Sequence, residues 1–144
     1  MATYKIEEVA KMCGLTKRTI RYYEEIGLLF PPERSEGGYR LYSEKHVERL
    51  KQILNARDVL GSSLQELQEY IAVIEEFQQL RQGIHEIREE KAKLEKLEGL
   101  ERTIGLQLTM IDQKLEKLTG FRAEVMELND RVQEAKRKII SHQE

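Results

Sequence analysis

Residues 13–42 constrain the fold of this chain more than any other stretch. Gly14 is a residue type that ends helices in the left-handed conformation, and Thr16 is a good N-cap for a following helix. We expect that second helix over residues 16–26, after a first helix over residues 5–13 whose apolar positions repeat at helical spacing. The stretch therefore predicts two helices joined by a tight turn.

The helix expected over residues 16–26 has two chemically different faces. Ile20, Tyr23 and Ile26 share one side, which the pattern assigns to the core. Two arginines and a tyrosine stand on another side at helical spacing. Guanidinium groups form paired hydrogen bonds with phosphate or guanine, and a phenol can donate to phosphate. This second face therefore predicts contact with a nucleic-acid duplex.

A hairpin is expected directly after this helix. The chain passes Pro31 and Pro32, and Gly37 and Gly38 then supply a tight turn. Aromatic and basic residues follow on the expected returning strand. Two helices followed by a basic, aromatic hairpin predict a winged helix-turn-helix, which is a DNA-binding fold.

The candidate contacts are the polar and aromatic side chains of the second helix and the returning strand. Surface charge and packing of the wing are the alternative explanation for this set, and Tyr23 and Tyr39 also suit a core. The predicted DNA-binding residues are Lys17, Arg18, Thr19, Arg21, Tyr22, Tyr39, Arg40 and Tyr42.

Residues 4–42, with the helix after them, resemble the DNA-binding domain of the MerR family of transcription regulators. The blocks that carry the resemblance are IEEVA at 6–10, TIRYYE at 19–24, GLL at 27–29, YRLY at 39–42 and VLG at 59–61. The resemblance implies a homodimer that binds a palindromic operator in double-stranded promoter DNA. It also implies activation or repression through distortion of the promoter, with RNA polymerase as a partner.

Two further helices are expected before the C-terminal half. Ser43 caps a third helix that ends near Leu60, and the capping box from Ser63 to Glu66 opens a fourth. We expect a break or bend near Gly83. The predicted domains are a winged helix-turn-helix at 1–74, a helical linker at 75–90 and a coiled-coil dimerisation region at 91–144.

The C-terminal half reads as long helix. It has no proline after residue 75 and is rich in Glu, Lys, Gln, Leu and Arg. Apolar residues step by three or four, which is typical of a coiled-coil seam, and the step changes phase at Gly120. The first seam comprises Leu97, Leu100, Ile104, Leu108, Ile111, Leu115 and Leu118. The second comprises Phe121, Val125, Leu128, Val132, Ala135 and Ile139.

A continuous helix and a helical hairpin turning at Gly120 both fit this phase change. The resemblance favours the hairpin, because related regulators have a long antiparallel dimerisation helix followed by a shorter helix. The expected fold is therefore mainly α. A narrow apolar stripe must also be covered in water, which predicts a homodimer.

Several kinds of site are not expected. The single cysteine, Cys13, falls on an inward helix face and rules out an internal disulfide, and the histidines are scattered. We therefore expect no metal site and no cofactor. With no phosphate-binding glycine loop and no nucleophile elbow, we expect no enzyme. No apolar run is long enough for a membrane span, and a cytoplasmic protein is expected.

The sequence does not identify a signal that would control the regulator, and it leaves one alternative function open. A small-molecule effector would need a pocket near the fourth helix. Its candidate walls are Tyr70, Phe77, Leu80 and Phe121, although these residues suit a plain dimer core better. The alternative function is a coiled-coil protein-interaction module or co-regulator without specific DNA binding.

Overall fold

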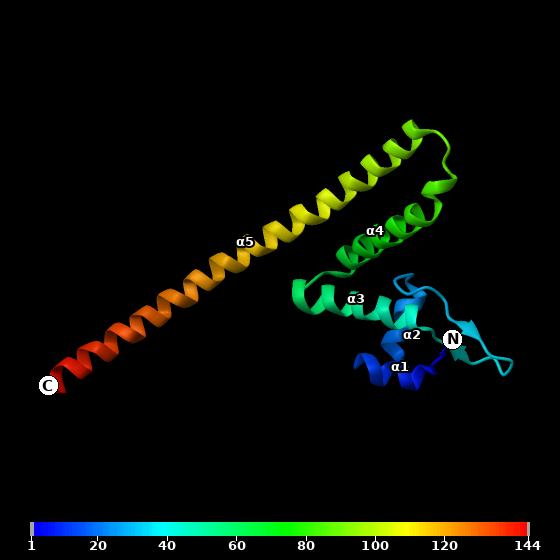
Figure 1. Ribbon diagram of the computed structural model, residues 1–144. Helices are drawn as coiled ribbons and strands as arrows, with labels where there is room; N and C mark the ends of the chain where they lie inside the picture. Colours follow the sequence, from blue (N-terminus) through cyan, green and yellow to red (C-terminus); the bar gives the residue numbers. More distant parts are fainter. Residues whose placement is uncertain (1, 144) are drawn as a thin grey trace. The chain divides into compact units, whose positions relative to one another are not determined.

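The computed structural model describes residues 2–143, and most of them are helical (Figure 1). The helices are α1 (Ile6–Cys13), α2 (Lys17–Glu25), α3 (Glu44–Leu60), α4 (Leu64–Gly83), a short 3-10 helix η1 (Ile84–Glu86) and α5 (Glu90–Gln143). The strands are β1 (Glu33–Arg34) and β2 (Arg40–Leu41). The expected order of helices and hairpin is confirmed, and α4 ends at Gly83, where a break is predicted.

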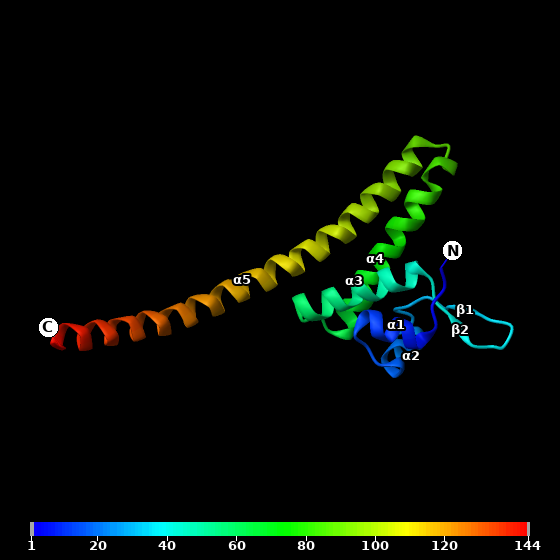
Figure 2. The same cartoon turned by 60° about the horizontal axis from the view of Figure 1, so that its bottom comes forward.

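The chain divides into two compact units. The first extends to Glu101 and the second begins at Arg102, so α5 starts in the first unit and continues into the second. In the first unit, α4 and the beginning of α5 run in opposite directions beside each other (Figures 1 and 2). Leu100, near the end of this first part of α5, is only 4% exposed.

One apolar core holds the first unit together. Its members come from α1, α2, the turn after α2, the residue after β2, α3 and the first half of α4. Burial of this many aliphatic and aromatic side chains is the main stabilising contribution to such a domain. The buried members include Val9, Ile20, Tyr23, Leu28, Leu29, Tyr42, Val47, Leu50, Ile53, Leu67 and Ile71.

Helix termini in the first unit follow local sequence signals. Gly14 and Gly61 take left-handed φ values of 66° and 61° and end α1 and α3. Ser63 begins α4 by accepting a hydrogen bond from the Glu66 N–H at 3.2 Å, while the Glu66 carboxylate accepts from the Ser63 N–H at 3.0 Å. This is the predicted capping box.

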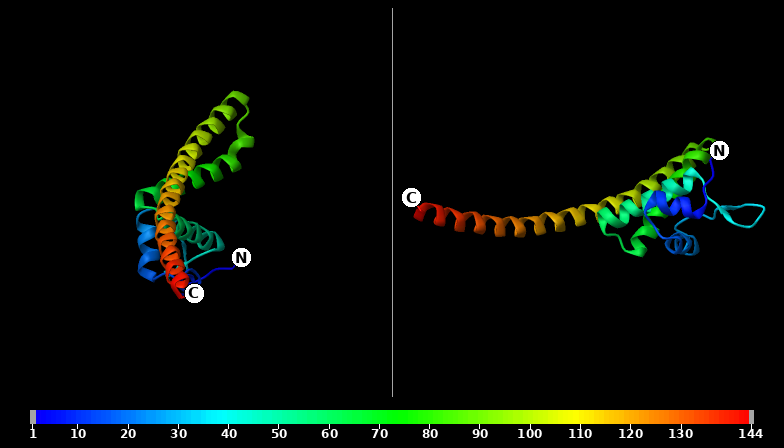
Figure 3. Two further views of the ribbon diagram at one scale, coloured as in Figure 1. Left: turned by 90° about the vertical axis from the view of Figure 1, so that its left-hand side faces the viewer. Right: turned by 90° about the horizontal axis from the view of Figure 1, so that it is seen from below.

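The two strands form a hairpin that projects from the helices (Figure 3). Glu33 pairs with Leu41 and Arg34 with Arg40 in an antiparallel register. The turn between them closes through a hydrogen bond from the Gly38 N–H to the Ser35 carbonyl at 2.9 Å. Tyr42 then exchanges two backbone hydrogen bonds with Tyr4, each 2.8 Å long, so that the base of the hairpin is tied to the N-terminal segment.

A partly buried ion pair joins α3 to α4. The Arg49 Nη1 lies 3.0 Å from the Glu75 Oε1, and the Arg49 guanidinium also stacks over the ring of Phe30. The Arg49 side chain is 6% exposed, so the pair is partly desolvated, and Glu75 keeps contact with water. The apolar periodicity of the sequence did not predict a charged residue in this part of the core.

The favoured helical hairpin at Gly120 is wrong, because α5 continues without a turn to Gln143. Gly120 has no positive φ and a Cβ there would meet no other atom, so this glycine needs no special conformation. The Thr119 hydroxyl donates to the Leu115 carbonyl at 2.8 Å, as threonines inside helices do. A lone glycine costs about 1 kcal/mol in a helix, which a long helix tolerates.

Candidate nucleic-acid interface

Helix α2 presents a polar face to solvent. Lys17, Arg18, Arg21 and Tyr22 are exposed, and Thr19 is half-buried beside them. Ile20 and Tyr23 on the opposite face are buried in the core. The structure therefore brings these five predicted contact residues together on one helix.

The N-terminus of α2 is fixed by threonines. Thr16 accepts a hydrogen bond from the Thr19 N–H at 3.1 Å, and the two hydroxyls are 2.8 Å apart. Lys17 lies on the same turn and contacts Glu7 of α1 at 3.2 Å in an exposed ion pair. Exposed pairs of this kind contribute little stability. The ammonium group can therefore exchange its partner for a phosphate at small cost.

The hairpin carries a second set of exposed side chains. Tyr39 is 52% exposed, and the Lys5 ammonium lies 5.3 Å from the centre of its ring. Arg34 is exposed on β1 and donates to the Gly38 carbonyl at 2.9 Å. Arg34 is absent from the predicted site, although its position opposite Arg40 across a two-stranded hairpin could have indicated it.

Glu24 connects α2 to the hairpin. Its carboxylate accepts a hydrogen bond from the Arg40 Nε at 3.0 Å and another from the Tyr42 hydroxyl at 2.6 Å. The Glu24 side chain is 10% exposed, so these bonds are shielded from water. They hold the hairpin at a defined position beside the exposed face of α2. A contact surface that is built from two elements needs such a fixed position.

Tyr42 is not placed to contact DNA, which corrects its inclusion among the predicted contacts. Its side chain is fully buried, and burial is the main cause that raises the pKa of its hydroxyl, followed by the hydrogen bond to Glu24. Arg40 is half-buried and already paired with Glu24. Among the basic and aromatic residues of the hairpin, Arg34 and Tyr39 are exposed.

The junction between α3 and α4 lies after Arg57 and Asp58. Arg57 donates to Asp58 at 2.9 Å and also to the Tyr23 hydroxyl at 3.3 Å. Both bonds favour the charged guanidinium, so they raise the pKa of Arg57, with the Asp58 bond contributing most. Arg57 is thus held against the buried side of α2 by the same tyrosine that anchors the helix.

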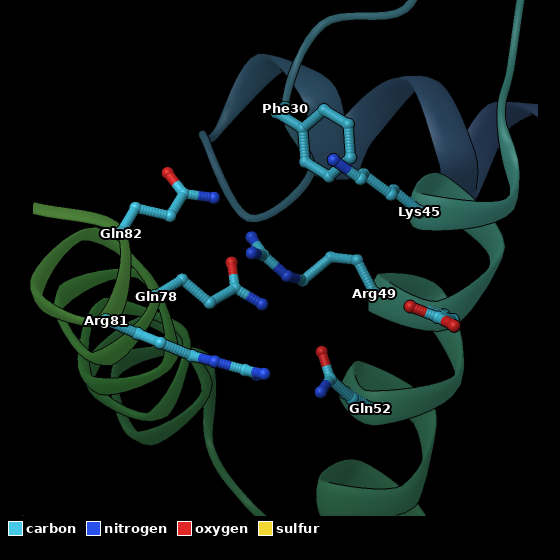
Figure 4. A pocket seen from close by; sticks show the side chains of 8 residues that line it. Phe30, Lys45, Arg49, Gln52, Gln78, Arg81 and Gln82 are labelled. Atoms are coloured by element: carbon cyan, nitrogen blue, oxygen red, sulfur yellow. The ribbon is translucent and has the colours of Figure 1, made fainter.

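A polar pocket of about 460 Å³ lies between α3 and α4 (Figure 4). Its lining combines Phe30 with cationic and amide side chains, including Arg49, Gln52, Gln78 and Arg81. The suggested lipophilic walls do not line it. Arg49 also donates hydrogen bonds to Glu75 and to the Leu28 carbonyl. Its buried guanidinium therefore holds α3 against α4 and the turn after α2.

Residues 2–143 contain no cluster of three or more His, Cys, Asp or Glu side chains that could hold a metal ion. Cys13 is half-buried, and burial raises the pKa of its thiol. Within the same residues, none of the helices combines the length and the apolar character needed to cross a membrane.

Known proteins resemble this chain over nearly its whole length. The family model described as "MerR HTH family regulatory protein" matches residues 4–74. The HTH-type transcriptional regulator YfmP of Bacillus subtilis (strain 168) is 40% identical over 139 residues, which span 96% of this chain and 99% of that protein. The HTH-type transcriptional regulator CueR of Salmonella typhi is 41% identical over 110 residues, 76% of this chain and 75% of that protein.

A solved structure is also similar. It is that of HiNmlR, a MerR family regulator lacking the sensor domain, bound to promoter DNA. The sequence identity is 21%, the TM-score is 0.45, and the match covers 80% of each chain.

The curated relatives are transcription regulators, not enzymes, and they favour DNA binding over the alternative of a protein-interaction module. The exposed basic face of α2 beside a hairpin agrees with that function. The chain belongs to the MerR family of DNA-binding transcription regulators.

Proposed function

We propose that this regulator binds a palindromic operator as a homodimer and controls transcription by distorting promoter DNA. The observation that carries the proposal is the exposed cluster of Arg18, Arg21 and Tyr22 on α2, with Tyr39 on the adjoining hairpin. A recognition helix of this kind enters the major groove, where arginines bind guanine edges and phosphates. The hairpin reaches the neighbouring backbone.

Lys17, Arg18, Thr19, Arg21 and Tyr22 form the proposed contact surface of α2. Tyr39 and Arg34 extend it along the hairpin, and Arg40 positions the hairpin through Glu24. In this assignment phosphate contacts supply most of the affinity and Arg21 supplies base discrimination.

A homodimer is proposed because α5 carries a row of exposed apolar residues along its length. Water disfavours such a row, and a second copy of the same helix covers it. A two-fold dimer presents two recognition helices and therefore matches a two-fold operator.

Membership of the MerR family is the basis for proposing promoter distortion and a contact with RNA polymerase. We assign no effector, and the polar pocket between α3 and α4 offers no lipophilic site. Action on promoter DNA places the protein in the cytoplasm in this proposal.

The test is titration of the full chain against labelled duplexes from the promoter region upstream of its own gene. Fluorescence anisotropy should show tight binding to a duplex with both half-sites and much weaker binding to a duplex with one. Affinity should fall steeply with salt, since phosphate contacts release counterions. Equal affinity for full and half sites would contradict a homodimer that binds both half-sites of the operator. Absence of binding at low salt would contradict DNA recognition itself.

A further inference from the structure

The pocket between α3 and α4 is lined by one polar face of each helix. Its basic and amide residues repeat at helical spacing, so that those of each helix share a single face. The α3 residues are Lys45, Arg49 and Gln52, and the α4 residues are Gln78, Arg81 and Gln82. Phe30, from the segment between α2 and β1, adds an aromatic wall. Two helices therefore direct cationic and amide groups toward one shared space.

This pocket has a net positive charge. Three of its lining residues are cationic, namely Lys45, Arg49 and Arg81, and one lining residue, Glu48, is a carboxylate. A positive charge remains even when Glu75, the ion-pair partner of Arg49, is counted. Cations that share a space repel one another, and an anion placed among them replaces this repulsion by attraction.

Arg49 is a buried cation that is held in place before any ligand binds. Its side chain is 6% exposed, and its Nη1 donates to Glu75 at 3.0 Å and to the Leu28 carbonyl at 3.5 Å. The guanidinium also lies 5.5 Å from the centre of the Phe30 ring. Figure 4 shows it directed into the pocket, toward the space that Gln78 and Arg81 also approach. A donor that is fixed in advance loses little freedom when an anion binds to it.

The other two cations are exposed at the two sides of the pocket. Lys45 lies on α3 and Arg81 lies on α4. Within residues 2–143, neither side chain has a carboxylate at ion-pair distance. Both groups can therefore turn toward a ligand without giving up an ion pair. The glutamines add amide groups, each of which can donate and accept hydrogen bonds.

We propose that this pocket binds a small organic molecule that carries a phosphate group. Guanidinium groups bind phosphate oxygens through paired hydrogen bonds, and a lysine adds a point charge. The volume of about 460 Å³ lies within the range of small-molecule sites and is larger than one phosphate group needs. The amide groups and Phe30 would then contact the organic part of the ligand.

The pocket is separate from the proposed DNA contact surface. The contact residues of α2 and of the hairpin are not among those that line it. Phe30 nevertheless leads through Pro31 and Pro32 directly into β1. A ligand in the pocket would thus contact α3, α4 and the segment that leads to the hairpin. The inference goes beyond DNA binding and does not depend on the proposed homodimer.

Isothermal titration calorimetry of the full chain with inorganic pyrophosphate tests the site, at an ionic strength held constant with sodium chloride. The expected result is saturable binding of one pyrophosphate per chain. Arg81→Gln and Lys45→Gln should each weaken it by about tenfold, because each removes a charge-assisted hydrogen bond. Arg88→Gln and Lys51→Gln are the matched controls. They remove the same charges outside the pocket lining and should leave the affinity unchanged.

Two further measurements separate this site from the DNA contact surface. Arg81→Gln should bind duplexes from the promoter region of the protein's own gene as tightly as the unchanged chain does. Arg21→Ala, on the DNA contact surface, should keep its affinity for pyrophosphate. A chain that binds pyrophosphate but no promoter duplex would leave this inference standing without the proposed function, and the reverse result would do the opposite.

Each contrary result overturns the inference. Absence of saturable binding at millimolar pyrophosphate would show that the pocket is no anion site. Equal weakening by the control variants would reduce the effect to net charge, and unchanged affinity in both Arg81→Gln and Lys45→Gln would place binding elsewhere. Loss of binding in Arg21→Ala would assign it to the DNA contact surface. Urea denaturation checks that the variants are folded, and Arg49 is left intact because its removal is expected to destabilise the first unit.

Discussion

The Tyr42 hydroxyl donates a hydrogen bond of 2.6 Å to the Glu24 carboxylate and so joins the end of the hairpin to helix α2. Arg40 donates to the other oxygen of the same carboxylate at 3.0 Å. One partly desolvated charge thus fixes the position of two chain segments that are far apart in sequence. Hydrogen bonds to charged groups are stronger than neutral ones, so this cluster is expected to matter for stability.

Tyr42→Phe should lower the free energy of unfolding by about 1–3 kcal/mol, because the Glu24 carboxylate loses a buried donor. Urea denaturation measures this change. Tyr39→Phe is the matched control, since that tyrosine is exposed and should leave stability almost unchanged. Equal stability of the two variants would mean that the Glu24 bond contributes nothing.

Arg21→Ala should weaken specific DNA binding by about 1–3 kcal/mol if the guanidinium reads a base edge. Its side chain is exposed, so stability should not change. Anisotropy titrations with operator and scrambled duplexes measure the affinity and the specificity. Arg88→Ala, outside α2 and the hairpin, serves as the control. Unchanged operator affinity would remove Arg21 from the site.

His46 predicts a stability loss in mildly acidic solution. Burial is the main cause that lowers the pKa of this imidazole, and its Nδ1 accepts the Ser43 N–H at 3.0 Å as a neutral ring must. Because the unfolded chain then binds the proton more readily, stability should fall as pH drops from the ordinary histidine pKa of about 6.5 towards the lower folded value. Urea unfolding at several pH values measures this slope.

The control for the pH effect is His46→Gln, which keeps a side chain able to accept the Ser43 N–H but cannot titrate. The variant should lose most of the slope between about pH 7.5 and 5.5, a range above the titration of ordinary carboxyls. Other histidines, His85 and His142, are exposed and remain in the variant. An undiminished slope would assign the pH dependence to groups other than His46.

Arg49→Met should destabilise the first unit by about 1–3 kcal/mol. The change keeps much of the side-chain volume but removes the bonds to Glu75 and to the Leu28 carbonyl. Glu75 is partly exposed, which limits the cost of leaving it unpaired. Glu75→Gln is the companion variant and should cost less. A neutral Arg49→Met would show that packing alone joins α3 to α4.

Local signals predicted much of the fold because they are strong here. The left-handed glycines Gly14 and Gly61 and the capping box from Ser63 to Glu66 mark helix boundaries by specific backbone requirements. The predicted contact residues on α2 were separable from core residues because a helix repeats its faces over several turns. The five predicted residues of α2 indeed lie together.

The errors occur where sequence carries little directional information. Tyr42 directly follows a strand of two residues, too short for its alternation to show which side chains turn inward. Tyr42 is buried by contacts with Glu24 and the N-terminal segment, which are distant in sequence. Gly120 suggested a turn, but glycine permits a turn without requiring one, and no proline or capping residue accompanies it.

Footprinting of the purified full chain on the promoter region upstream of its own gene tests the central claim most directly. The account predicts protection of a palindrome between the two promoter elements, with enhanced cleavage at its centre where the DNA is distorted. The same footprint should disappear for Arg21→Ala at equal protein concentration. Protection without a two-fold pattern, or no protection at low salt, would contradict the proposal of a dimeric regulator that distorts its operator.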